Sequence, residues 1–78
     1  MSDYIAEIRI RDVLNRAPES RLNLTQVENF VNAIRQKAYF DPILVKQIQK
    51  GKFWLKDGSH RTEACERLGM SRIKAQIT

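Results

Sequence analysis

The sequence is poor in the residues that mark several specialised classes of protein. Its single cysteine, Cys65, cannot form an internal disulfide, which excludes a small scaffold stapled by disulfide bonds. The single histidine and that cysteine have no cluster of carboxylates near them, which excludes a structural zinc site. The longest strictly apolar run is Ile43–Val45, far below the roughly 20 residues that span a bilayer. Asp3 and Glu7 interrupt any apolar stretch that could act as a signal peptide, so we expect a cytoplasmic protein without a membrane partner.

The chain also lacks repeats, low-complexity tracts and linkers rich in glycine or proline. Its 78 residues are expected to form one small domain, residues 1–78. A chain of this size buries only about 60% of the surface that its unfolded form exposes, so the core is expected to be modest. Hydrophobic residues make up 42% of the sequence, which is too many for a disordered chain and predicts a folded globular domain.

The charge is basic and unevenly distributed. Fourteen lysines and arginines against nine acidic residues give a net charge of +5 and a pI near 9.8. This balance favours anionic partners, either nucleic acid or phosphorylated small molecules. Residues 41–56 carry four lysines against Asp41 alone, so this short segment supplies +3 of the +5.

The N-terminal half predicts a strand followed by a helix. Apolar and charged residues alternate from Ala6 to Val13, which is typical of a half-buried strand. Asn15–Asn23 is polar and is predicted to be a loop. Thr25 and Glu28 form a capping-box pattern, so a helix is expected over about residues 25–38, until Asp41-Pro42 breaks it. The apolar positions of this helix have helical spacing: Val27, Phe30, Val31 and Ile34.

Two further strands, Ile43–Ile48 and Phe53–Lys56, are predicted to form a hairpin with Gly51 at a positive φ. A turn centred on Lys50-Gly51 would place Ile48 opposite Phe53, and Lys46 opposite Leu55. These pairings predict one core face, formed by Leu44, Ile48, Phe53 and Leu55, and they place Trp54 and Lys56 on the other face.

A second helix is expected from about Ser59 to Leu68, closed by Gly69 in the C′ position. Cys65 is predicted to be a small core residue of this helix. A last strand, Arg72–Thr78, completes the order β-α-β-β-α-β. The predicted fold is therefore α+β, a small mixed sheet with two helices.

The chemistry is expected in the segment that joins the hairpin to the second helix, Asp57–Ala64. Gly58 would let the backbone approach a ligand, and the first turn of the helix offers free N–H groups to an anion. His60 and Arg61 add side-chain donors there. The alternatives are structural: Ser59 as the helix N-cap and Arg61 in an ion pair with Asp57 or Glu63. Asp57 is first a turn residue, and it could orient His60 or help a phosphate to hold a metal.

These motifs together resemble the ParB/sulfiredoxin-like superfamily. The resemblance rests on Asp41–Val45, the hairpin, the Gly-x-[His/Arg]-Arg-x-x-Ala box at residues 58–64, and Leu68-Gly69 with Ile73. Pro18 and Arg21 also loosely match the Pro-Arg element of that superfamily. The resemblance implies that Gly58, Ser59, His60 and Arg61 contact nucleotide phosphates, because members bind CTP, ATP or ADP at this box. The expected ligand is therefore a nucleoside triphosphate or diphosphate with Mg²⁺. No metal site of the chain's own is expected, because one carboxylate cannot hold Mg²⁺ without help from the ligand.

Some residues of this sequence differ from those that particular members of the superfamily need, and these differences exclude some of the activities of the superfamily. Sulfiredoxins need a cysteine just before the His-Arg pair, and Ser59 cannot form their sulfur–sulfur intermediate, so sulfiredoxin activity is not expected. Free serine kinases carry an Asp-Gly-x-His-Arg box similar to this one and need a carboxylate base, for which Glu7 and Glu19 are the candidates. Partition proteins continue into a second motif and a helix-turn-helix domain, so a DNA clamp is not expected of this chain alone.

The expected function is a nucleotide- or phosphate-binding module, with Asp57–Arg61 as its site, that acts with DNA or a larger partner protein. One alternative is a small phosphotransfer or nuclease enzyme that uses the same pocket. The other is a DNA-binding or protein-binding adaptor that uses the basic hairpin. In the adaptor Trp54 would stack a base; otherwise it would pack against the C-terminal strand or a helix, with the lysines forming a solvated edge. The candidate nucleic-acid-binding residues are Lys46, Lys50, Lys52, Trp54 and Lys56.

Overall fold

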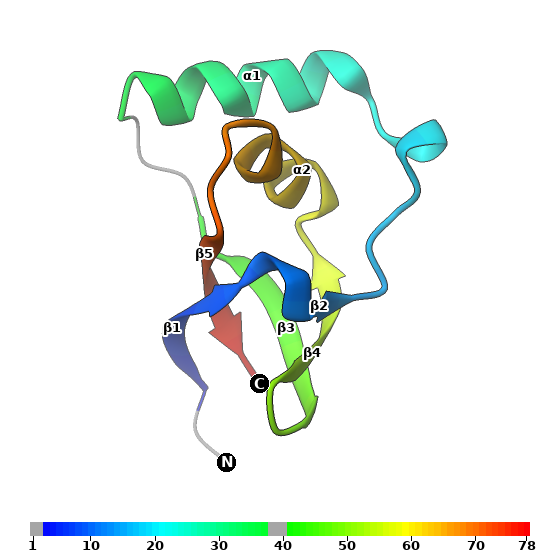
Figure 1. The fold of residues 1–78 in the computed structure, drawn as a ribbon, viewed down its shortest axis with the longest axis vertical. Helices are drawn as coiled ribbons and strands as arrows, with labels where there is room; N and C mark the ends of the chain where they lie inside the picture. Colours follow the sequence, from blue (N-terminus) through cyan, green and yellow to red (C-terminus); the bar gives the residue numbers. More distant parts are fainter. Residues whose placement is uncertain (1–2, 38–40) are drawn as a thin grey trace.

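Five strands form one mixed sheet in the order β1-β5-β3-β4-β2 (Figure 1). The computed structural model describes residues 3–37 and 41–78. The central strand β3 runs antiparallel to β4 and parallel to β5, while β1 pairs antiparallel with β5 and β2 parallel with β4. The predicted α+β fold is confirmed, with one additional short strand. The strands are β1 (Tyr4–Arg9), β2 (Val13–Leu14), β3 (Ile43–Gln49), β4 (Lys52–Asp57) and β5 (Arg72–Ile77), and the helices are α1 (Leu24–Arg35) and α2 (Ser59–Arg67).

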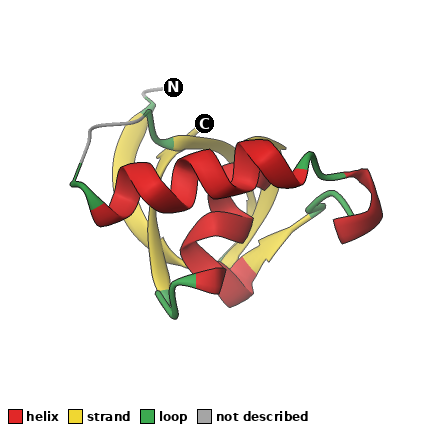
Figure 2. Ribbon diagram, turned by 90° about the horizontal axis from the view of Figure 1, so that it is seen from above, coloured by secondary structure: helices red, strands yellow, loops and turns green. Residues whose placement is uncertain are grey.

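The two helices stack in layers, with α2 between α1 and the sheet (Figures 1 and 2). The main core lies between the inner face of the sheet and α2, and it consists of Ile8, Ile10, Val13, Ile43, Val45, Phe53, Leu55, Cys65, Ile73, Ala75 and Ile77. Cys65 is 1% exposed, so its predicted core position is confirmed. A second cluster joins α1 to α2 through the fully buried Val27 and Ala64, with the predicted apolar positions Phe30, Val31 and Ile34 packed around them. Within the described residues, neither helix is long and apolar enough to cross a membrane.

The first predicted strand is wrong at its C-terminal end. β1 stops at Arg9, a 3-10 turn follows over Ile10–Asp12, and the chain re-enters the sheet as β2. Ile10 and Val13 are both buried, yet they are three residues apart, so a straight strand would point them to opposite faces. The turn resolves this conflict by burying both side chains. It thereby carries the chain from one edge of the sheet to the other.

The first helix is capped differently from the prediction. Asn23, rather than Thr25, is the N-cap, and its side-chain oxygen accepts hydrogen bonds from the N–H groups of Thr25 (3.0 Å) and Gln26 (3.2 Å). The helix therefore begins at Leu24, and it ends at Arg35, before Asp41-Pro42. The predicted end at residue 38 lies outside the described residues.

The hairpin is confirmed, with Gly51 at φ +74°, but its predicted register is wrong. Lys46 pairs with Trp54 instead of Leu55, and Gln47 pairs with Phe53. The register shifts between Gln47 and Gln49, so the residue between them, Ile48, is left out of the pairing. As a result the core face of β3 consists of Ile43 and Val45; Leu44 is only partly buried and Ile48 is 48% exposed.

The end of α2 and the last strand follow the prediction. Gly69 adopts φ +77°, its N–H bonds to the carbonyl of Glu66, and the N–H of Met70 bonds to the carbonyl of Cys65. These two bonds form the Schellman closure expected of a C′ glycine. β5 then buries the three alternating residues Ile73, Ala75 and Ile77.

Candidate functional site

The box Asp57–Arg61 lies where β4 ends and α2 begins. Gly58 is the N-cap of α2 and adopts φ +122°, a conformation that residues with a side chain rarely adopt. A Cβ at this position would lie 2.5 Å from Ile43 Cγ2 and 2.8 Å from Ile43 Cβ. The backbone angle and the buried Ile43 together require glycine here. The close approach that Gly58 permits is thus an approach to the core of the fold.

The N-terminus of α2 has no side-chain cap. Its first intrahelical bond runs from the N–H of Thr62 to the carbonyl of Gly58 (2.9 Å), and the Thr62 hydroxyl donates to the same carbonyl (2.8 Å). The N–H groups of Ser59, His60 and Arg61 precede this bond, so α2 itself provides them with no acceptor. Three backbone donors and the positive end of the helix dipole therefore coincide at the box.

The side chains of Ser59 and His60 hold the loop that precedes α1. Ser59 was a candidate N-cap, and that role is wrong: it is the first residue of α2, and its hydroxyl accepts a hydrogen bond from the N–H of Ala17 (3.0 Å). His60 Nε2 accepts a hydrogen bond from the N–H of Asn23 (3.0 Å). A neutral imidazole that accepts at Nε2 carries its proton on Nδ1. His60 is therefore oriented by the loop and retains an Nδ1–H donor.

Ion pairs connect the same loop to residues farther along α2. Arg16 donates to Glu63 and to Glu66 over 3.1 Å, and this hydrogen bond lowers the pKa of the Glu66 carboxyl despite some opposing burial. Arg67 donates to Glu63 (3.0 Å) and to Glu19 (3.2 Å). Glu19 is thus engaged at the end of α2 remote from the box, where it cannot serve as a base for that site. Glu7, the other candidate, lies on β1 opposite Lys74.

Arg61 is largely buried and makes the structural contacts that were its alternative role. Its Nη2 donates to Asp57 Oδ2 (3.1 Å), and its Nη1 donates to the carbonyls of Asp41 (2.7 Å) and Pro42 (3.0 Å). The side chain is 13% exposed, whereas the Asp57 side chain is 75% exposed. Arg61 therefore ties the start of α2 to the segment that leads into β3. Asp57 contacts Arg61 and does not orient His60, and Glu63 pairs with arginines other than Arg61.

The hairpin residues form a separate group. Trp54 lies on the face of β4 opposite Phe53 and Leu55, and it is 45% exposed. Its strand neighbours are Lys46 of β3 and Leu14 of β2, and β3 separates β4 from the C-terminal strand β5. The structure therefore divides the candidate residues into two sites. One is the box at the start of α2, and the other is the outer face of the hairpin, from which the candidate Lys50 is excluded because it lies in the turn between β3 and β4.

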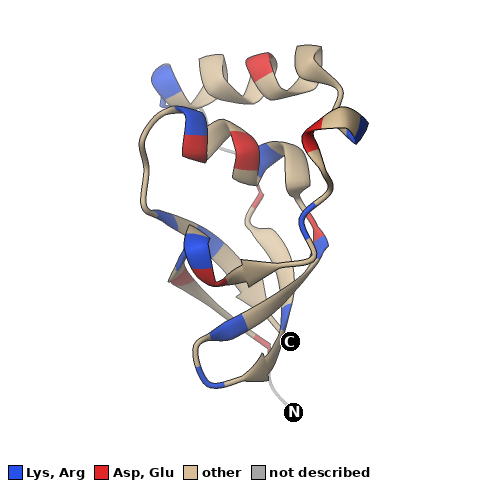
Figure 3. Ribbon diagram, turned by 45° about the vertical axis from the view of Figure 1, so that its right-hand side comes forward, with Lys and Arg blue, Asp and Glu red and all other residues tan. Residues whose placement is uncertain are grey.

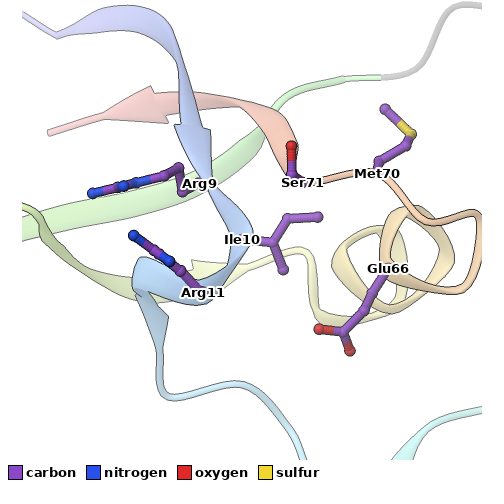
Figure 4. A pocket seen from close by; sticks show the side chains of 6 residues that line it. All are labelled: Arg9, Ile10, Arg11, Glu66, Met70 and Ser71. Carbon is purple, nitrogen blue, oxygen red and sulfur yellow. The ribbon is translucent and has the colours of Figure 1, made fainter.

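Two open surface hollows lie away from the box. One of about 320 Å³ is lined by Arg9, Ile10, Arg11, Glu66, Met70 and Ser71. Figure 4 shows the side chains of Arg9 and Arg11 extending in one direction while Ile10 points the opposite way. Arg9 already pairs with Asp12 (3.2 Å), and Glu66 with Arg16. Two of the three charged side chains that line this hollow are thus already paired. The other, of about 420 Å³, lies beside the hairpin tip and is lined by Tyr4, Gln47, Ile48, Gln49, Lys50, Ile77 and Thr78.

Comparison with known proteins identifies the family. The family model for the ParB N-terminal domain matches residues 1–78. The chain belongs to the ParB N-terminal domain family. No match is found among curated proteins.

Solved structures with the same fold include enzymes and a partition protein. Sulfiredoxin from Arabidopsis thaliana is 28% identical, with a TM-score of 0.79, and the match covers 96% of this chain and 84% of the sulfiredoxin. The C-terminally truncated chromosome-partitioning protein ParB from Caulobacter crescentus, complexed with CTP-gamma-S, is 24% identical with a TM-score of 0.74 and 96% coverage of this chain. A free serine kinase in complex with AMP is 18% identical with a TM-score of 0.79 and 95% coverage. The match spans only 44% of that ParB chain and 30% of the kinase chain.

Proposed function

We propose that this ParB N-terminal domain binds a nucleotide and holds its phosphates at the box Asp57–Arg61. The observation that carries the proposal is the uncapped start of α2, where three N–H groups precede the first intrahelical bond. Such a helix terminus favours phosphate through both its free donors and its dipole. The start of α1 differs, because Asn23 already occupies the N–H groups there.

The side chains of the box support an anion in addition to the backbone. The exposed carboxylate of Asp57 would repel a phosphate if it were alone, and its ion pair with Arg61 offsets that charge. The three hydrogen bonds of Arg61 leave further donors on Nε and Nη2, in a guanidinium whose position is already fixed. His60 contributes its Nδ1–H. Little side-chain freedom would be lost on binding, because the fold has already ordered these groups.

The related structures support the ligand class. The partition protein is complexed with CTP-gamma-S, and the free serine kinases are complexed with AMP or ADP. We therefore propose a nucleoside diphosphate or triphosphate as the ligand. Among the described residues no three metal-ligating side chains lie together. Mg²⁺ would therefore be held mainly by phosphate oxygens, with Asp57 as the carboxylate of the box. Membership of the ParB N-terminal domain family supports the further proposal that the domain acts with DNA or a larger partner protein.

The test is calorimetric titration of ATP, ADP and CTP, with and without Mg²⁺, into the wild type and Ser59→Asp. The aspartate keeps an oxygen that can accept from the Ala17 N–H and places a negative charge at the helix N-terminus. That charge should stabilise α2 by about 0.3–1 kcal/mol and repel a phosphate at the same point. We expect nucleotide affinity to fall by about tenfold or more, which corresponds to about 1.4 kcal/mol, with an unchanged or higher melting temperature.

Ser71→Asp is the matched control, because it makes the same change in charge at an exposed position outside the box. It should leave nucleotide affinity within about twofold of the wild type. Equal affinities for wild type and Ser59→Asp would contradict the proposed site. The absence of nucleotide binding at millimolar ligand would contradict the proposed function itself.

A further inference from the structure

The outer face of the hairpin concentrates positive charge around one exposed aromatic ring. The register places Lys46 directly opposite Trp54, and cross-strand partners have Cβ atoms about 4.5–5.5 Å apart. Lys52 and Lys56 precede and follow Trp54 by two residues on the same strand, so they share its face. Trp54 therefore lies among three lysines. We call Lys46, Lys52, Trp54 and Lys56 the hairpin patch.

This patch faces away from the helices. The neighbouring residues Phe53 and Leu55 point into the core, whereas Trp54 is 45% exposed. Figure 3 shows basic positions on the hairpin and at its tip, below the acidic and basic pairs of the helices. None of the three lysines forms an ion pair with a described residue, in contrast to the arginines of the loop and α2. The positive charge of the hairpin patch is therefore uncompensated.

We propose that the hairpin patch binds single-stranded nucleic acid, with one base stacked on Trp54 and the flanking phosphates held by Lys46, Lys52 and Lys56. Lys52 and Lys56 are about 13 Å apart along β4 at about 3.3 Å per residue, which allows contacts on both sides of a stacked base. An acidic peptide would use the lysines but would not require the indole ring. A duplex would also use the lysines, but its bases are already stacked on one another. An unpaired strand uses both features of the patch.

The proposal concerns a surface separate from the box, so it goes beyond the binding of a nucleotide there. It also gives a role to the residues of the hairpin patch, which take no part in the proposed nucleotide site. Trp54 is the only tryptophan of the chain, so its fluorescence reports on this patch alone.

The experiment titrates the wild type with a short oligothymidylate, a duplex of the same length and polyglutamate, following Trp54 fluorescence at several salt concentrations. We expect the single strand to quench the fluorescence and to lose affinity as salt rises. Binding of labelled oligothymidylate, measured by anisotropy, should weaken by about 5- to 150-fold in Trp54→Leu, the range for loss of one base–aromatic stack, and much less in Trp54→Phe.

Matched controls separate the patch from general charge. Lys46→Gln should weaken binding more than Lys37→Gln, because Lys37 is exposed near the end of α1 and lies outside the patch. Ser59→Asp should bind the oligonucleotide like the wild type, which distinguishes this surface from the box. Equal affinity for the duplex without quenching, quenching by polyglutamate as strong as by the single strand, or no binding at low salt would each overturn the proposal.

Discussion

Replacing Gly58 by alanine tests whether the fold itself, rather than a ligand, requires glycine at the start of the box. The new Cβ would lie 2.5 Å from Ile43 Cγ2, a separation that forces something to move. The neighbour is a fully buried side chain at the beginning of β3, so it has little room to move. Two costs add here. The φ of +122° strains any residue with a Cβ by about 1–3 kcal/mol, and overpacking of a core costs about 1–3 kcal/mol more.

The expected loss for Gly58→Ala is therefore about 2–6 kcal/mol, a large part of the 5–15 kcal/mol that stabilises a typical domain. At about 4–8 °C per kcal/mol, the melting temperature should fall by about 8 °C or more. Thermal and urea unfolding, followed by circular dichroism in the absence of nucleotide, measure this directly. Gly69→Ala is the control, because φ there is +77° but nothing lies within 4 Å of the new Cβ. It should incur only the cost of the backbone strain, about 1–2 kcal/mol.

A double variant identifies the contact. Ile43→Ala removes Cγ2, the nearer atom that the new Cβ would meet, and retains the Ile43 Cβ at 2.8 Å, at the cost of a cavity worth about 2–5 kcal/mol. Combined with Gly58→Ala, the two losses should be less than additive, because the shorter of the two contacts, the one with Cγ2, no longer exists. Full additivity, or a Gly58→Ala loss no greater than that of Gly69→Ala, would refute the assignment of Gly58 to packing against Ile43.

Three further predictions concern the caps, the loop and the thiol. Asn23→Ala should destabilise the protein by about 0.5–2 kcal/mol, because it removes the side-chain acceptor at the start of α1, while Asn23→Asp should retain most of the stability in urea unfolding. The Arg16 hydrogen bond lowers the pKa of Glu66 below its usual 4.5, so this contact stabilises the protein above that pH and is lost as the pH falls through the lowered value. The free energy of unfolding, measured as the pH is lowered, should therefore fall less in Arg16→Gln than in the wild type. An unchanged dependence on pH would count against the pairing. Burial raises the pKa of the Cys65 thiol, so native protein at neutral pH should react with a thiol reagent far more slowly than protein unfolded in urea.

Local patterns in the sequence predicted most of the secondary structure. The alternation of residues 72–77, the polar turn around Gly51 and the apolar spacing of residues 27–34 each depend on neighbours in the chain, and each was confirmed. The early end of β1 could not be predicted in this way. Ile8, Ile10 and Val13 fit a strand by composition, and only the burial of both Ile10 and Val13 in one core forces the turn between them.

The hairpin register shows the same limit. Three consecutive apolar residues, Ile43 to Val45, leave both faces of β3 open to burial as far as the sequence is concerned. Packing under α2 selects Ile43 and Val45, and the shift around Ile48 then places Lys46 opposite Trp54. The sequence thus supplied the lysines and the tryptophan, but tertiary packing determined that they lie together.

The box divides between the two levels in a similar way. Its location at a strand–helix junction, its glycine and its basic residues were determined by the sequence and by the resemblance to the family. The partners of its side chains were not, because they come from segments distant in the chain: Ala17 and Asn23 for Ser59 and His60, and the residues before β3 for Arg61. Hydrogen bonds between such segments depend on how the loop folds back onto α2. Local sequence therefore determined the position of the proposed anion site, and the tertiary structure decided that the side chains there also hold the fold together.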